Sequence, residues 1–387
     1  MDVSARVALG SSRVHVTRMG LGTVPLGGLY EPVDDEEAKA LVLRSFELGV
    51  RLFDTAPQYG SGLAERRLSR VLAGLPRDEL VVATKVGRLI RRLSTSAKVV
   101  TVVREAVVNR DVSRLTSASR HVLHRLQGRT AHPATATTAE DATAPGFTSV
   151  FDFSYDGAMR SLEESLDRLK LDRVDMLLLH DPDYYFKQAM AGAYRAIEQL
   201  RRDGTVGAIG VGMNQSAMLA RFAREADFDC FLVAGRYTLL DQTALDDLLP
   251  ICEKRGSSVI VGGVYNSGIL ADPRPGTHFN YEPAAQAWLD KAIRIKAVCD
   301  RHGVPLKAAA VQFPFGHPAV ATVLAGSRSV AEVEENAAML AHPIPTDLWA
   351  ELRHEGLIAP HVPTPGGDAA ATPTSEAEGV PAGAGSS

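Results

Sequence analysis

The amino-acid sequence predicts an α/β protein whose strand–helix units close into a (β/α)8 TIM barrel. Short apolar runs alternate with longer segments of helical period along most of the 387 residues. These runs are apolar on both faces, as is typical of parallel strands that are covered by helices. We count eight runs, and eight such units are the number that closes a barrel.

The chain is expected to begin with an N-terminal β-hairpin that lies outside the eight strands. Residues 6–18 alternate apolar and polar side chains around the turn sequence Gly10-Ser11-Ser12, which is typical of a hairpin. We expect this hairpin to cap the bottom of the barrel. The first barrel strand is predicted at residues 24–27, and Asp34 and Asp35 are predicted to cap the first helix.

The glycine-rich stretch at residues 20–30 superficially resembles a dinucleotide-binding turn. It lacks the GxGxxG spacing, and no helix begins directly after it. A Rossmann motif needs both, because its glycines lead the chain into a helix whose N-terminus faces the pyrophosphate. We therefore reject a Rossmann interpretation of this stretch.

The other elements follow as seven further strand–helix units. The strands are predicted at residues 50–54, 79–87, 174–183, 208–214, 228–237, 257–270 and 319–327. Helices are predicted at residues 34–48, 63–73, 156–170, 187–203, 216–225, 241–255, 283–302 and 329–340, with another that starts near 305.

Two regions do not fit the repeat. Residues 91–150 form a long insertion after strand three, in which 97–126 has helical character and 128–149 is rich in Ala, Thr and Pro without any period. Such composition is typical of mobile loops, so we expect a partly disordered insertion over the mouth of the barrel. We assign residues 1–362 to a single domain and residues 363–387 to a disordered tail.

Composition excludes several classes of function. The net charge of −4 provides no basic excess for nucleic acid or for an anionic membrane surface. The three cysteines include no CxxC pair, which argues against a zinc knuckle or a disulfide framework. No apolar stretch is long enough to span a membrane. We expect a cytoplasmic protein, either a monomer or a homo-oligomer.

Four polar residues are predicted to meet at the carboxyl ends of the strands, where barrels of this kind carry their active sites. Asp54 ends the second strand and Tyr59 follows it, while Lys85 ends the third strand and His180 the fourth. A lysine on a buried strand needs a partner, and Asp54 can supply it. The ammonium would lower the pKa of Tyr59 from about 10, so that the phenol can exchange a proton with an oxygen that His180 orients.

Each of these residues also has a purely structural interpretation. Asp54 can cap the next helix, Tyr59 can be a half-buried loop aromatic, and His180 can be a hydrogen-bonded histidine at a strand end. A metal site built from His180, Asp181 and Asp183 is disfavoured, because Pro182 intervenes and no second histidine converges on it. We therefore expect proton chemistry and no metal.

Six motifs in order resemble the aldo-keto reductase superfamily: GLGTVPLGG, FDTAPQYGSGLAERRLSRVL, VVATKVGRL, SLEESLDRLKLDRVDMLLLHD, GAIGVGMN and VLAGSRSVAEVEENAAM. KVGRL, VFDFSYDG and GGVYNSGIL resemble in particular the bacterial branch of L-fucose and D-threo-aldose 1-dehydrogenases and pyridoxal 4-dehydrogenase. The resemblance covers about residues 13–345, apart from most of 91–149.

The resemblance implies a hydride transfer between a nicotinamide cofactor and a sugar-like or other small alcohol or carbonyl substrate. Asp54, Tyr59, Lys85 and His180 match the family's catalytic tetrad, with Tyr59 as proton donor and acceptor. Two alternatives stay open. One is a general NADPH-dependent aldehyde or ketone reductase, and the other is a cofactor-binding redox sensor subunit.

The resemblance also implies a cofactor site. Its residues are Gly22, Thr23, Asp54, Asn214, Gly263, Val264, Asn266, Ser267, Gly268, Leu270, Gly326, Ser327, Arg328, Glu332, Glu335 and Asn336. The chain departs from the family at Met213, usually a serine, and at Arg236-Tyr237, where many members carry a glutamine. It also has Gly262-Gly263 where many members stack a tyrosine on the nicotinamide.

The choice between NAD and NADP depends on the adenosine end of this site. Arg328 can pair with a 2′-phosphate, whereas the carboxylate of Glu332 would repel it and suits a free 2′-hydroxyl. We therefore favour NAD over NADP.

Overall fold

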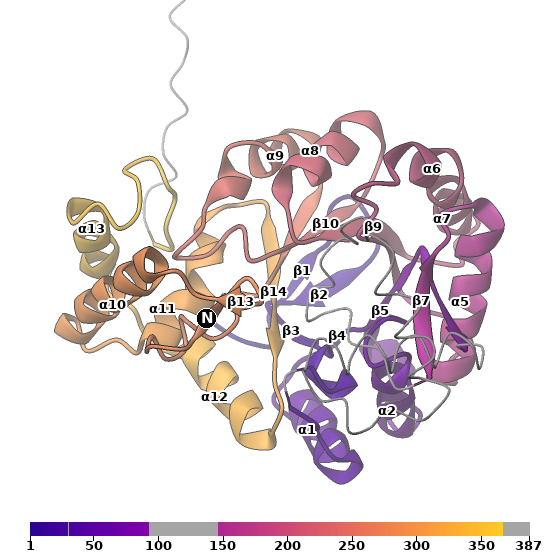
Figure 1. Cartoon of the computed structure of the whole chain (residues 1–387), viewed down its shortest axis with the longest axis horizontal. Coiled ribbons are helices and arrows are strands. Elements are labelled where there is room, and N and C mark those ends of the chain that lie inside the picture. The colour runs from indigo at the N-terminus through magenta and orange to yellow at the C-terminus, as the bar shows by residue number, and fades with distance from the viewer. Residues whose placement is uncertain (30, 93–145, 367–387) are drawn as a thin grey trace, which may run out of the picture.

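A computed structural model describes residues 1–29, 31–92 and 146–366 and contains the predicted closed barrel (Figure 1). Eight parallel strands are hydrogen-bonded in the order β3-β4-β5-β8-β9-β10-β11-β14, and β14 closes the ring on β3. Their bounds are β3 Met19–Gly22, β4 Leu52–Asp54, β5 Val81–Val86, β8 Met176–His180, β9 Ala208–Met213, β10 Cys230–Ala234, β11 Ser258–Gly262 and β14 Val320–Gly326.

Helices surround the barrel (Figure 1). They are α1 Asp35–Glu47, α2 Leu63–Leu72, α5 Tyr155–Leu169, α6 Phe186–Ala191, α7 Ala193–Arg202, α8 Ser216–Glu225, α9 Leu248–Arg255, α10 Gln286–Arg301, α11 Leu306–Gln312, α12 Val330–Ala341 and α13 Thr346–His354. Short 3-10 turns are η1 Pro25–Gly27, η2 Arg77–Glu79, η4 Thr243–Leu245 and η5 Phe313–Gly316.

The helix predicted at residues 187–203 is in fact two helices, α6 and α7, separated at Gly192. A side chain there would collide with the backbone, because a Cβ on Gly192 would lie 2.5 Å from the Phe153 carbonyl oxygen. Ala193 donates its N–H to that same carbonyl at 2.8 Å. The break therefore lets the chain pack closely on the segment that precedes α5.

The predicted position of the first strand, residues 24–27, is wrong. The strand is β3, and Pro25 begins the 3-10 turn η1 that follows it. Proline has no N–H for a strand ladder, and its fixed φ suits the first position of a helical turn.

The N-terminal hairpin caps the bottom of the barrel, as predicted. Strands β1 (Arg6–Ala8) and β2 (His15–Thr17) pair antiparallel. Leu9, Val14 and Val16 pack against inward-facing residues of the barrel strands, such as Met176. A larger apolar core lies between the outer faces of the strands and the helices.

Strand β5 leads directly into a two-stranded ribbon formed by β6 (Arg88–Arg92) and β7 (Phe147–Phe151). Residues 147–149, which we expected in a mobile loop, pair with β6 because antiparallel hydrogen bonds satisfy both backbones. The helix predicted at residues 97–126 and the rest of that loop lie outside the described residues.

The C-terminal residues up to Gly366 pack on the barrel, so the expected disordered tail is wrong for residues 363–366. Thr364 is buried, and its hydroxyl accepts a hydrogen bond from Arg353 at 2.8 Å. The backbone of Pro363 lies so close to Gly316 that a Cβ there would meet its carbonyl oxygen at 2.5 Å. The remaining tail residues lie outside the described part of the chain.

A further small ribbon, β12 (His278–Phe279) and β13 (Glu282–Pro283), follows β11.

Candidate active site

Lys85 lies at the centre of the site, on the inner face of β5, with 2% of its surface exposed. Its Nζ donates to both carboxylate oxygens of Asp54, at 2.9 and 2.8 Å, and to the Thr55 carbonyl at 3.0 Å. Burial raises the pKa of the Asp54 carboxyl, and the Lys85 ammonium opposes that shift. Helix α2 begins only after Gly62, so Asp54 anchors the lysine and does not cap the helix.

Tyr59 is placed against the same ammonium, with its hydroxyl 2.9 Å from Lys85 Nζ. The loop that carries it presses against η1, since a Cβ on Gly60 would lie 2.4 Å from the Gly27 carbonyl oxygen. Gly60 also has a φ of +59°, which favours glycine. This close approach fixes the position of the phenol.

His180 ends β8 and completes the group of four predicted residues. Its ring meets the Tyr59 ring edge-on, with 5.9 Å between centroids and an interplanar angle of 90°. Burial lowers the pKa of His180 well below its usual value, and the charges of Arg88 and Lys85 lower it further. The imidazole is therefore neutral at neutral pH.

Two residues that sequence reasoning did not assign to this site lie beside His180. Arg88 Nη2 is 2.5 Å from Asp181 Oδ2, and that same oxygen is 3.6 Å from His180 Nε2. The Arg88 guanidinium also lies over the Phe151 ring, 4.7 Å from its centroid. Arg88 lies in the KVGRL motif three positions after Lys85, which is the signal that could have found it, whereas Asp181 enters the sequence analysis only in a disfavoured metal site. Among the described residues, no group of three His, Cys, Asp or Glu side chains could hold a metal ion.

The ends of β3 and β9 place three of the expected cofactor residues. Gly22 pairs with Asp54 in the sheet, and the Thr23 hydroxyl donates to the Asp54 carbonyl at 2.9 Å. Asn214 follows β9, and its carbonyl accepts from Arg236 Nε at 2.8 Å. The Arg236 side chain therefore contacts the backbone of Asn214. Arg236 stands at the position where the sequence departs from the glutamine of many family members.

The loop after β11 carries the residues that are expected to cover a pyrophosphate. Consecutive residues Asn266, Ser267 and Gly268 have φ values of +44°, +59° and +101°, and the backbone N–H groups of Asn266 and Gly268 donate to the carbonyls of Gly263 and Tyr265, at 2.8 and 3.0 Å. The Oδ1 of Asn266 is buried without a hydrogen-bond partner in the described structure, whereas its Nδ2 donates to the Gly235 carbonyl. Gly263, with a φ of +63°, starts the loop, and Val264 and Leu270 anchor it in the core.

The residues expected at the adenosine end run from the last residue of β14 into α12. Asn336 of α12 donates to Ser327 Oγ at 3.0 Å and accepts from the hydroxyl of Tyr265, in the loop after β11, at 2.8 Å. Gly326 ends β14, and Glu335 pairs with Lys307 of α11 at 2.6 Å. These hydrogen bonds of Asn336 connect α12 to the loop after β11.

Arg328 and Glu332 form an ion pair at the same end, with 2.8 Å between Nη2 and Oε1. Arg328 also pairs with Glu31 at 2.9 Å. The first N–H of α12, at Val330, donates to Glu37 Oε1 at 3.0 Å. An open pocket of about 280 Å³ here is lined by Glu31, Pro32, Val33, Asp34, Glu37, Arg328, Ser329 and Glu332.

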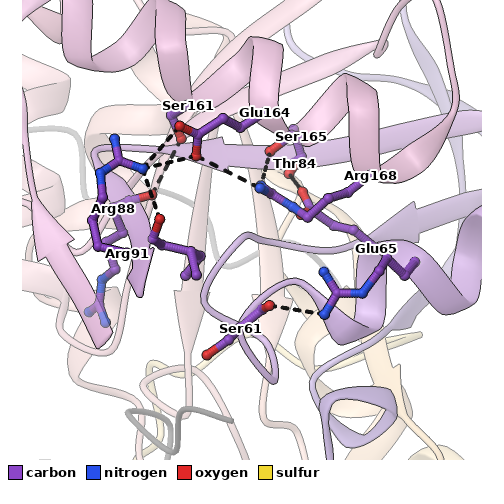
Figure 2. Close-up of polar contacts among 11 residues, drawn as sticks. Ser61, Glu65, Thr84, Arg88, Arg91, Ser161, Glu164, Ser165 and Arg168 are labelled. Carbon is purple, nitrogen blue, oxygen red and sulfur yellow. Dashed lines mark hydrogen bonds and ion pairs between the residues drawn. The ribbon is translucent and has the colours of Figure 1, made fainter. Parts of the chain in front are cut away.

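A second polar network lies on the outer face of β5 and includes Thr84 (Figure 2). Thr84 donates to Glu65 of α2 at 2.9 Å, and Arg168 of α5 forms an ion pair with the same carboxylate. Glu65 is fully buried. Lys85 and Thr84 are adjacent in β5. Lys85 therefore faces the site, while Thr84 contacts Glu65 of α2, which pairs with Arg168 of α5.

Comparison with known proteins identifies the family. Residues 18–132 and 144–354 match the Aldo/keto reductase family. The chain is 36% identical to pyridoxal 4-dehydrogenase of Microbacterium luteolum over 93% of this chain and 99% of that protein. It is also 36% identical to D-threo-aldose 1-dehydrogenase of a Pseudomonas species, over 94% and 99% of the two chains.

Solved structures of low sequence identity share the fold. Glycerol dehydrogenase from Gluconobacter oxydans superimposes with a TM-score of 0.67 at 21% identity, covering 94% of this chain and 97% of the other. An aldo-keto reductase from Bacillus halodurans, in its holo form, gives a TM-score of 0.64 at 23% identity over 91% and 96% of the chains. None of the described helices is long and apolar enough to cross a membrane. The family match and the two relatives of 36% identity show that the chain belongs to the aldo/keto reductase family of nicotinamide-dependent oxidoreductases.

Proposed function

We propose that this protein interconverts a sugar-like or other small alcohol and its carbonyl form, with Tyr59 as proton donor and acceptor. The observation that carries the proposal is Lys85 Nζ, which bonds to Asp54 and to the Tyr59 hydroxyl in one buried cluster. The substrate class is supported by the two relatives named as an aldose 1-dehydrogenase and a pyridoxal 4-dehydrogenase.

The residues of the site have separate tasks in this proposal. The Lys85 ammonium favours the phenolate of Tyr59, and Asp54 holds the ammonium in place. In oxidation Tyr59 takes the hydroxyl proton of the substrate, and in reduction it returns a proton to the same oxygen. Neutral His180 orients that oxygen through a hydrogen bond. A nicotinamide, when bound, supplies the redox chemistry by accepting or donating the hydride.

A Tyr59→Phe variant tests the proton-transfer role. We expect kcat/KM to fall by about 10²- to 10⁴-fold, the range for loss of a general acid or base, with cofactor binding unchanged in a fluorescence titration. Tyr184→Phe is the matched control, because Tyr184 is 88% exposed. The assay is a panel of aldoses, pyridoxal and simple aldehydes with both cofactors in both directions.

The outcomes of this assay separate the alternatives. Unchanged activity in Tyr59→Phe would rule out the proposed mechanism. Activity confined to NADPH and simple aldehydes would support the general reductase. A wild-type protein that binds the cofactor but converts none of the panel would support the redox sensor.

We infer further that NAD is the preferred cofactor. The groups that could hold a 2′-phosphate are engaged by this chain's own carboxylates. Arg328 is paired with Glu332 and Glu31, and the first N–H of α12 donates to Glu37. A phosphate would have to displace these carboxylates and would meet their negative charge, whereas a ribose hydroxyl can accept a hydrogen bond or donate one to them.

Charge reversal at Glu332 tests the cofactor preference. We expect Glu332→Arg to lower the Kd for NADP relative to that for NAD by about tenfold or more, which corresponds to about 1.4 kcal/mol. Glu334→Arg is the control, because Glu334 lies on the same helix and pairs with Arg44. No gain in NADP binding by Glu332→Arg would contradict the proposed basis of the preference.

A further inference from the structure

Arg88 is fixed beside the site by the turn that joins β5 to β6. Gly87 has a φ of +101°, and a Cβ there would lie 2.1 Å from Cε1 of Phe153, so the backbone passes directly over that ring. Arg88 then pairs with Phe151 across the ribbon, and its guanidinium lies over the Phe151 ring. The side chain is 9% exposed, so the guanidinium is held in one place and largely desolvated.

Asp181 is held beside Arg88 by its backbone. Its φ is +47°, which is uncommon for a residue with a side chain, and its N–H donates to the Gly212 carbonyl at 3.0 Å. In this conformation one carboxylate oxygen, Oδ2, faces two basic groups. It is 2.5 Å from Arg88 Nη2 but 3.6 Å from His180 Nε2, and the second distance is too long for a hydrogen bond.

The two basic groups therefore compete for one carboxylate. A carboxylate beside a histidine normally stabilises the imidazolium. Here the ion pair with Arg88 neutralises the carboxylate and adds a positive charge near the ring. The other charged or titratable groups of the described residues close to His180 are Lys85 from β5, with its partner Asp54, and Tyr59 from the loop after β4.

We propose that Arg88 is a positioning residue, whose ion pair with Asp181 keeps that carboxylate from pairing with the His180 ring. This inference rests on the proposed function, in which His180 orients the reacting oxygen. A protonated ring would place a second positive charge beside Lys85 and would add a competing proton donor next to Tyr59. The Arg88–Asp181 pair would thus leave proton exchange to the tyrosine alone.

An NMR titration of His180 tests this role without any need for turnover. The protein is labelled at its histidine side chains, and a His180→Asn variant identifies the signal. We expect Arg88→Met to raise the pKa of His180 by about one or more, because Arg88 no longer engages the Asp181 carboxylate and no longer repels a proton on the ring. Asp181→Asn should leave the pKa low or lower it further, and Arg88→Met/Asp181→Asn should reverse most of the rise.

The pKa of His180 should rise in Arg88→Met but not in Asp181→Asn, and this difference distinguishes the proposed role from simple disruption of the fold. Arg92→Met is the control, since Arg92 lies at the exposed end of the same strand β6, and it should leave the pKa of His180 unchanged. For an active protein, the kcat/KM profile of Arg88→Met should gain an inflection at the raised pKa. An unchanged pKa in Arg88→Met, or a rise that persists in the double variant, would overturn the inference.

The test also separates this inference from the proposed function. A raised pKa in Arg88→Met together with a wild type that converts no substrate would retain the ion-pair role and reject the dehydrogenase. An active wild type whose His180 titrates alike in all the variants would reject the role of Arg88 alone.

Discussion

Lys85 is a buried cation whose hydrogen-bonding capacity is fully used. An ammonium has three N–H donors, and Nζ of Lys85 lies within 3.0 Å of both Asp54 oxygens, the Thr55 carbonyl and the Tyr59 hydroxyl. Without these acceptors the desolvated charge would be costly. The same contacts that stabilise the lysine therefore place it against the phenol.

Removal of Lys85 should destabilise the protein, because it leaves a buried carboxylate without its partner. We expect Lys85→Met to lower the free energy of unfolding by about 3–5 kcal/mol, because it leaves the Asp54 carboxylate buried without its partner. Lys85→Met/Asp54→Asn should recover more than about 1 kcal/mol of that loss, since no uncompensated charge remains. Urea denaturation followed by circular dichroism measures both, and equal destabilisation of the two variants would contradict this account of the pair.

The sequence predicted which residues could form the site but not all of their partners. Asp54, Tyr59, Lys85 and His180 could be placed because each ends a strand or follows one. Arg88 and Asp181 could not be paired, because their contact depends on how the β5–β6 turn packs on Phe153 and on the backbone conformation of Asp181.

At the scale of elements, β5 connects the site to the helices around it. Its side chains alternate, so Lys85 faces the inside of the barrel while Thr84 faces α2 and α5. Thr84, Glu65 and Arg168 form one buried network on the outer face of β5 (Figure 2). Helices α2 and α5 are therefore fixed to the strand that carries the lysine.

Loss of the Glu65 carboxylate should loosen this connection. We expect Glu65→Ala to destabilise the protein by about 3–5 kcal/mol, because Arg168 loses the buried partner of its charge. Asp167→Ala is the control on α5, since the Asp167–Lys170 pair is exposed and such pairs contribute about 0–1 kcal/mol. Thermal unfolding measures the difference, and a similar effect of the two substitutions would argue against the network.

At the scale of the whole molecule, the barrel is closed at the bottom by the N-terminal hairpin and open at the top to the site. Gly10 of the hairpin donates to Ser258 Oγ, at the first residue of β11, at 2.7 Å. Leu9 is fully buried among the inward-facing side chains. The hairpin therefore belongs to the core of the barrel and stabilises it from the face opposite the chemistry.

Truncation of Leu9 tests the contribution of the hairpin. We expect Leu9→Ala to cost about 2–5 kcal/mol of stability through lost burial and a residual cavity. KM values should change little, because the active site lies at the other end of the strands. Ile293→Ala is the control, because Ile293 is 45% exposed on α10 and surface substitutions stay within about 0.5 kcal/mol. An equal loss in the two variants would mean that the hairpin is not part of the core.

The sequence by itself determined the eightfold alternation, the barrel class and the four residues at the strand ends. These follow from local periodicity and from the rule that parallel strands present their carboxyl ends at one face. Apart from the Asp54–Lys85 pair, which the sequence predicted, the tertiary structure decided which side chains pair. Arg328 and Glu31 lie 297 positions apart in the chain yet form an ion pair, and Arg88 meets Asp181 across 93 positions. Such contacts depend on distances of a few ångströms between elements, and these are set by closure and packing of the barrel.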